Sequence, residues 1–91
     1  MKRTLLVIAV LLAASASAHA APSELARLNA QIINDPRNIE LNLRYARAAE
    51  AEGDYGKALA AYERVLSYEP GNAEARKGVN RAGARMLPNT F

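Results

Sequence analysis

The acidic residues, the glycines and the single histidine are the residues of this chain that could support chemistry. There is no Cys and no Trp, and the one histidine, His19, lies in an N-terminal leader. Glu50 and Glu52 stand two residues apart, so on a helix they point to different faces and cannot act as paired carboxylates. Asp54 follows Gly53 at the start of an apolar helical pattern, where an acid caps a helix. The glycines have neither the GxGxxG nor the GxxxxGK spacing of a phosphate-binding loop. We therefore expect no enzyme, no cofactor, no metal and no small-molecule substrate.

The remaining class of function is binding through surface side chains, which helices would have to position. Apolar residues recurring at three- and four-residue steps predict four helices and no strand. We expect a capping side chain before each helix and a proline after three of them, because the residue before a proline disfavours helical dihedrals. The expected caps are Ser23, Asn38, Asp54 and Asn72, and the closing prolines are Pro36, Pro70 and Pro88. The residues expected to turn inward are Leu25, Leu28, Ile32, Ile33, Leu41, Leu43, Tyr45, Ala48, Ala49, Ala58, Leu59, Tyr62, Val65, Leu66, Ala75, Val79 and Ala82.

Residues 1–20 have the composition of a secretory signal peptide. A basic start precedes an apolar run over residues 5–14, and small residues follow at Ala18 and Ala20, which is the order of a cleavable leader. A run of this length is too short to cross a bilayer, which takes about 20 residues. We expect the signal peptide to span 1–20, with export to a bacterial periplasm or, alternatively, secretion. A helical domain over 21–87 and a C-terminal tail over 88–91 should follow.

Removal of the leader changes the charge of the chain. The whole sequence has a net charge of +3, with 12 basic and 9 acidic residues. Two of the basic residues, Lys2 and Arg3, leave with the leader, so the remainder has ten basic and nine acidic residues and a net charge of +1. The basic character of the whole chain is therefore partly a property of the signal peptide.

One seven-residue pattern occurs twice. Residues 35–41 (DPRNIEL) and residues 69–75 (EPGNAEA) share their acidic, Pro, Asn, Glu and apolar positions. Carrying the same offset backwards pairs three apolar positions of the first helix with three of the third. The pairs are Leu25 with Leu59, Leu28 with Tyr62 and Ile32 with Leu66. A two-helix unit that recurs at this offset has the period of the tetratricopeptide repeat, about 34 residues.

These features resemble the tetratricopeptide-repeat (TPR) family. That family's Ala-x-x-x-Phe motif falls on Ala58 and Tyr62, and its closing proline falls on Pro70. Its Trp falls on Asn42, so the first helix of the repeat is less bulky than the family pattern. The resemblance covers one full repeat, 39–72, with half a repeat on each side. It implies an all-α fold in which antiparallel helix pairs stack as a short α-solenoid of about four helices.

The resemblance also implies a binding surface, because in TPR proteins the first helix of each pair lines a concave groove. The positions that line this groove fall on Glu40, Leu43, Arg44, Arg47, Glu50, Lys77, Arg81 and Arg85. The cations among them would favour an acidic peptide. The family's clamp for a terminal carboxylate needs Lys and Asn where this chain has Leu43 and Arg47, so we do not expect that clamp. The expected function is an exported adaptor or scaffold for protein–protein interaction.

Three other interpretations bear on partners. The chain could instead be the N-terminal export-plus-TPR segment of a larger protein, such as an outer-membrane protein, truncated here. Nucleic-acid binding is not expected, because no aromatic residue is interleaved with the arginines of the last helix to stack on bases. Helix 23–34 looks more apolar than one neighbour can cover, so we expect it either to form a homodimer with its counterpart in a second copy or to dock on a partner. The last helix, by contrast, looks polar enough to end the stack.

Overall fold

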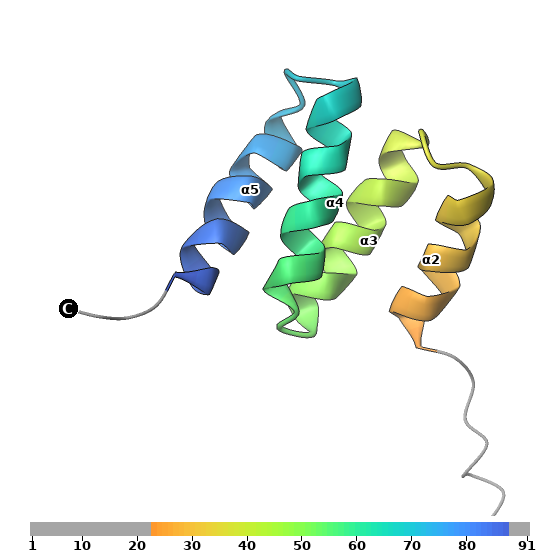
Figure 1. The fold of residues 1–91 in the computed structure, drawn as a ribbon, viewed down its shortest axis with the longest axis horizontal. Helices are drawn as coiled ribbons and strands as arrows, with labels where there is room; N and C mark the ends of the chain where they lie inside the picture. Colours follow the sequence, from red (N-terminus) through yellow and green to blue (C-terminus); the bar gives the residue numbers. More distant parts are fainter. Residues whose placement is uncertain (1–22, 88–91) are drawn as a thin grey trace, which may run out of the picture.

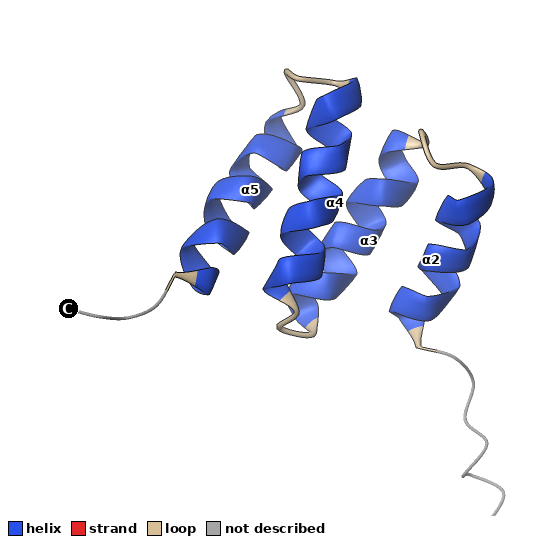
Figure 2. Cartoon of the chain, in the orientation of Figure 1, coloured by secondary structure: helices blue, strands red, loops and turns tan. Residues whose placement is uncertain are grey.

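The computed structural model describes residues 23–87, which fold into four α-helices and contain no strand. The helices are α2 (Glu24–Asn34), α3 (Ile39–Ala51), α4 (Tyr55–Tyr68) and α5 (Ala73–Met86). Figure 1 shows them as a row in chain order, each antiparallel to the one before, and Figure 2 shows the short loops between them. Each helix packs on the next, and α3 also touches α5. The prediction of an all-α fold with four sequential antiparallel helices is confirmed.

Three predicted features lie outside the described residues. They are the signal peptide over 1–20, the tail over 88–91 and the closing proline Pro88. The helical domain expected over 21–87 is described from Ser23 to Leu87. Within that part of the chain, no helix has both the length and the apolar character that crossing a membrane requires.

The four predicted capping residues all cap their helices. In each case a side-chain oxygen accepts a hydrogen bond from the backbone N–H three residues further on, at 2.9 to 3.2 Å. These bonds satisfy N–H groups that a helix leaves free in its first turn. Between α3 and α4, Gly53 takes a φ of +79°, a left-handed conformation that glycine adopts without strain. The predicted cap at Asp54 is confirmed, and Gly53 makes the turn that precedes it.

The two linkers that share the repeated sequence also share their hydrogen bonds. In the first linker, the side-chain amide of Asn38 donates to Asp35 Oδ2 at 2.9 Å, and its backbone N–H donates to the Asp35 carbonyl at 3.2 Å. In the second linker, Asn72 donates in the same two ways to Glu69, at 3.0 Å to Oε1 and 2.9 Å to the carbonyl. The helices that follow begin at the matching positions of the two copies, 39 and 73. The sequence repeat is therefore also a repeat of local structure.

The main core joins α3, α4 and α5. Tyr62 and Val65 of α4 are its largest fully buried apolar side chains, and Ala46 and Ala58 are fully buried in the same core. The core consists of Leu25, Leu43, Ala46, Ala49, Ala58, Ala61, Tyr62, Val65, Ala75 and Ala82. A smaller cluster of Leu28, Ile32 and Leu41 joins α2 to α3. Most of the remaining residues that were expected to turn inward are half-buried against these two clusters.

One prediction for the first helix is wrong. Leu25, Leu28 and Ile32 are buried, but Ile33 is 70% exposed. On a helix of 3.6 residues per turn, Ile33 is rotated about 100° from Ile32 and therefore leaves the face that packs on α3. Helix α3 therefore covers only part of the apolar surface of α2 and leaves Ile33 exposed. The homodimer through helix 23–34 stays a prediction.

The outward faces of both end helices are polar. When the two copies of the repeat are aligned, Ala58, Ala61 and Val65 of α4 are fully buried, whereas α2 has exposed Glu24, Arg27 and Gln31 at these positions. In the same way, Leu43, Ala46 and Ala49 of α3 are buried, and α5 has Lys77, Asn80 and Gly83. The predicted polar face of the last helix is confirmed, and the first helix has such a face as well. At these aligned positions, neither end helix has the apolar side chains that the inner helices bury.

Candidate protein-binding face between α3 and α5

The residues predicted to line a groove come from α3 and α5, the two helices that touch without being consecutive. On α3, Arg44 and Arg47 are exposed, and on α5 Lys77, Arg81 and Arg85 are exposed. We call this surface the α3–α5 face and define it by Glu40, Arg44, Arg47, Glu50, Glu74, Lys77, Arg81 and Arg85. Leu43 was predicted to line it but is only 5% exposed and belongs to the core. Leu43 therefore supports the face from below and cannot contact a partner.

Arg47 joins the two helices near one end of the face. Its guanidinium donates to Glu74 Oε2 of α5 at 2.6 Å and to Glu40 Oε2 of its own helix at 3.0 Å. The hydrogen bond to Glu74 is the main reason that the pKa of Arg47 is raised above its ordinary value. All three side chains remain between 41% and 65% exposed, so water and salt reach this group of charges.

Glu50, Arg81 and Tyr62 form a tighter group in the middle of the face. Arg81 donates from Nε to Glu50 Oε2 at 2.6 Å and from a terminal nitrogen to Oε1 at 2.7 Å, and the Tyr62 hydroxyl donates to Oε1 at 2.7 Å. The Glu50 side chain is only 16% exposed. The bond from Arg81 lowers the pKa of Glu50, and the same pairing raises the pKa of Arg81. Burial, helped by the bond to Glu50, raises the pKa of Tyr62 to about 12.

Arg85 occupies the far end of α5 and reaches the first residue of α4. Its guanidinium donates to the Tyr55 hydroxyl at 3.1 Å, and its central carbon lies 5.1 Å from the centre of the Tyr55 ring. This is cation–π geometry, which holds an arginine over an aromatic face. Arg81 and Arg85 therefore fasten α5 to its neighbours.

The cations of the α3–α5 face divide into those that contact another side chain of the face or Tyr55 and those that form no ion pair. Arg47 and Arg81 pair with carboxylates, and Arg85 packs on a tyrosine. Arg44 and Lys77 are exposed and form no ion pair among residues 23–87. Five cations against three carboxylates leave the face with a small positive excess, less than the arginines and lysine alone suggest.

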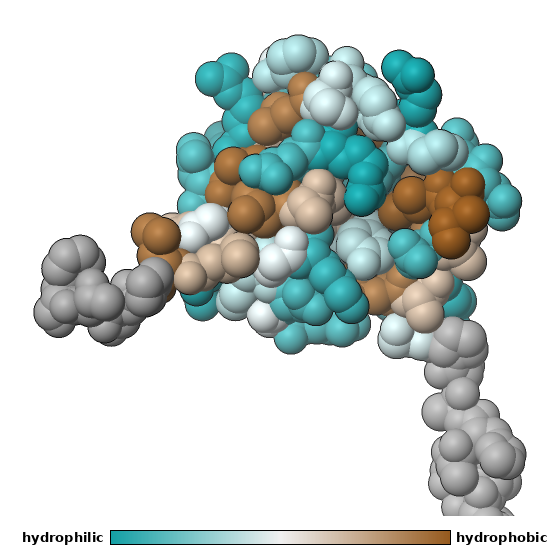
Figure 3. All heavy atoms as spheres, in the orientation of Figure 1, coloured by the Kyte–Doolittle hydropathy of each residue, from teal (hydrophilic) through white to brown (hydrophobic). Residues whose placement is uncertain are grey.

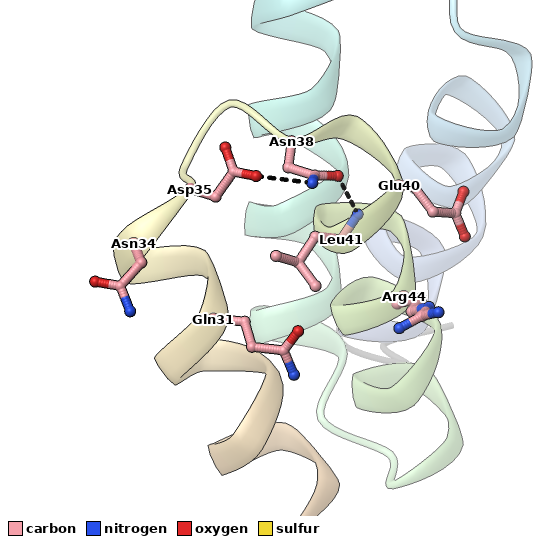
Figure 4. A pocket seen from close by; sticks show the side chains of 7 residues that line it. All are labelled: Gln31, Asn34, Asp35, Asn38, Glu40, Leu41 and Arg44. Atoms are coloured by element: carbon pink, nitrogen blue, oxygen red, sulfur yellow. Dashed lines mark hydrogen bonds between the residues drawn. The ribbon is translucent and has the colours of Figure 1, made fainter.

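A pocket of about 450 Å³ opens beside this face, between α2, α3 and the linker that joins them. Figure 4 shows its lining side chains, with Asp35 and Asn38 tied to each other by the linker hydrogen bond. The lining consists of Gln31, Asn34, Asp35, Asn38, Glu40, Leu41 and Arg44. Two of these residues, Glu40 and Arg44, also belong to the α3–α5 face. Over residues 23–87, no group of three or more Asp, Glu, His or Cys side chains is arranged to hold a metal ion.

Two structural residues were missed from the sequence. Asn42 is fully buried, where its amide donates to the carbonyls of Pro36 and Asn38 and its oxygen accepts from Arg64 at 2.7 Å. Its position at the family's Trp, a large packing residue, was the available signal for burial. Gly78 is buried against the Tyr62 ring, so that an added Cβ would lie 2.5 Å from ring atoms. Nothing in the sequence pattern indicated that contact.

The rest of the described surface includes a second pocket, of about 370 Å³, between α2, α3 and the start of α4. Figure 3 shows apolar atoms exposed over α2 and where α5 ends, with polar atoms over much of the area between. The exposed large apolar side chains are Ile33, Tyr68, Met86 and Leu87. Arg37 covers the Tyr68 ring at 4.8 Å. Comparison of the chain with protein-family models, curated proteins and solved structures gives no match.

Proposed function

We propose that this chain is an exported adaptor built on TPR-type repeats, which binds another protein through the α3–α5 face. The observation that carries the proposal is the pairing of α3 and α5 across that face. Arg47 with Glu74, and Glu50 with Arg81, hold side by side two helices that are not consecutive in the chain. A surface shared by alternate helices is what a stacked pair of helical repeats creates.

The repeat character is supported by the two linkers. They recur at the same point of each copy with the same acid–Asn hydrogen bonds, and each is followed by a helix of the same kind. Helices α2 and α4 also end at matching positions of the two copies, Asn34 and Tyr68. A pair of antiparallel helices that recurs about every 34 positions has the period of the TPR.

The choice of face is supported by what the other surfaces lack. The outward sides of α2 and α5 have polar side chains where inner helices bury apolar ones, so a partner gains little by stacking there. On the α3–α5 face, Arg44 and Lys77 are exposed. The arginines beside them can release the carboxylates of this chain and bind carboxylates of a partner instead. Charged groups of this kind steer and align an incoming protein segment. A segment with acidic side chains is the complementary partner.

A pair of charge reversals on one helix tests the proposal. Lys77 lies at the edge of the α3–α5 face, about 40° around α5 from Arg81, and its neighbour Arg76 is also exposed but lies about 100° further from Arg81. The mature chain and both variants, Lys77→Glu and Arg76→Glu, are immobilised, and periplasmic extract of the source organism is passed over each. We expect a protein that is retained by the wild-type chain and by Arg76→Glu but lost from Lys77→Glu.

The controls separate loss of binding from loss of structure. Both variants should keep the helical circular dichroism and the melting temperature of the wild-type chain, because each residue is exposed. A retained protein that is lost equally from both variants, or from neither, would contradict binding through the α3–α5 face.

A further inference from the structure

The two end helices of the row are held in different ways. The residues that α2 buries are Leu25, Leu28 and Ile32, and those that α5 buries are Ala75, Gly78 and Ala82. Helix α2 thus buries large apolar side chains, whereas the buried residues of α5 have side chains no larger than a methyl group, with Val79 half-buried beside them. The ion pair that α2 forms among the described residues, Glu24 with Arg27, lies within the helix and ties it to nothing else.

Helix α5 is instead tied to its neighbours by charged groups along its whole length. Glu74 near its start pairs with Arg47 of α3, Arg81 in its middle pairs with Glu50, and Arg85 near its end bonds the Tyr55 hydroxyl. Each of the charged α5 side chains in the two ion pairs is between 41% and 52% exposed. Ion pairs at this exposure are weakened by dissolved salt.

We infer that α5 is a salt-sensitive end helix, which its charge pairs help to hold on the row and whose docking loosens when salt screens those pairs. Raising salt from about 0.01 M to about 1 M shortens the distance over which exposed charges interact from about 30 Å to about 3 Å. The same change does not weaken apolar burial. The docking of α5 therefore loosens with salt, and the docking of α2 does not. Ends of a helical array open separately from its centre when their own contacts are weak.

Detachment of α5 removes one side of the α3–α5 face. It takes away Glu74, Lys77, Arg81 and Arg85 together and uncovers the ring of Tyr62, which Gly78 contacts. Ionic strength would then decide whether the binding face exists. This consequence rests on the proposed function, whereas the salt-dependent docking of α5 does not.

Hydrogen exchange measured by mass spectrometry tests the docking without any partner. Exchange of the mature chain is followed in about 0.01 M and about 1 M sodium chloride, the range over which screening changes most, and peptides from α2 and α5 are compared within the same sample. Single exposed pairs change an equilibrium by about twofold to fivefold, so two pairs and the Arg85 contact together should speed α5 exchange roughly tenfold at high salt. Exchange in α2 should change much less, which makes α2 an internal control.

Charge-removing variants assign the effect to the pairs. Arg81→Gln should exchange quickly in α5 already at low salt and show a smaller response to added salt. Arg47→Gln, at a more exposed pair, should do the same to a lesser degree and serves if Arg81→Gln does not fold. Arg27→Gln breaks the pair inside α2 and should leave the salt response of α5 unchanged. Equal salt responses of α2 and α5 in the wild-type chain, or a full salt response in both Arg81→Gln and Arg47→Gln, would overturn the inference.

Discussion

Replacing Gly78 with alanine tests how α5 packs on α4. A Cβ atom at residue 78 would lie 2.5 Å from both Cδ2 and Cζ of the Tyr62 ring. The ring cannot move aside, because it is fully buried and Glu50 holds its hydroxyl at 2.7 Å. Carbon atoms that are not bonded to each other pack best at about 3.5 to 4.0 Å, so α5 would have to move outward by about 1 Å.

Two opposing contributions set the change that Gly78→Ala makes in the free energy of unfolding. Alanine is a better helix former than glycine by about 1 kcal/mol, and inserting a methyl group into a filled core costs about 1 to 3 kcal/mol. Three atoms of a fixed ring stand in the way, which places the cost in the upper half of that range. Gly78→Ala should therefore lower the free energy of unfolding by about 1 to 2 kcal/mol. Gly83 of the same helix meets nothing within 4 Å, so Gly83→Ala should raise it by up to about 1 kcal/mol.

Urea unfolding followed by circular dichroism measures both changes against the wild-type chain. A second step adds Tyr62→Leu to Gly78→Ala, because the smaller side chain leaves room for the methyl group and should reduce the cost of the alanine. A coupling between residues 62 and 78 would appear as a departure from additivity. The packing described here would be refuted if Gly78→Ala stabilised the chain as Gly83→Ala does.

The remaining predictions concern the core, pH and processing. Ala58 is fully buried, so Ala58→Leu should cost about 1 to 3 kcal/mol by overpacking, and an unchanged melting curve would argue against the packing of α4. Burial raises the pKa of Tyr62 from 10.0 to about 12, so stability should be complete below pH 10.0 and fall towards pH 12, and Tyr62→Phe should remove that loss. Arg81 lowers the pKa of Glu50 from 4.5, so the stability that this carboxylate adds should be present above pH 4.5 and lost below it; a Glu50→Gln melt as acid-sensitive as the wild type would contradict this. The intact mass of the exported protein should begin at Ala21, or at His19 where a second cut, after Ala18, is used, and a mature form that retains residues 5–14 would rule out cleavage.

The helices were predictable from the sequence because their boundaries depend on local chemistry. Asn38, Asp54 and Asn72 cap helices through bonds to residues three positions away, and Gly53 turns the chain through its own dihedral angles. Such signals are complete within a few residues. The prediction for the inward face of α2 wrongly included Ile33. Ile33 is apolar, but it does not pack on α3.

The contacts across the row could be predicted less well, because they depend on which side chains meet between distant segments. The resemblance to TPR proteins placed Arg47, Glu50 and Arg81 on one surface, and the structure brings them together. It did not indicate that these charges would pair with one another, which lowers the positive excess of the face. The hydrogen bond of Arg64 to Asn42 and the contact of Gly78 with Tyr62 depend on three-dimensional packing alone.

Photo-crosslinking in the living cell is the measurement that tests the central claim most directly. A photoreactive amino acid is placed either at Lys77, on the α3–α5 face, or at the adjacent Arg76, which is exposed but turned away. Binding through the α3–α5 face predicts a discrete crosslinked protein from residue 77 and none from residue 76. Crosslinks of equal yield from both positions, or from residue 76 alone, would contradict it.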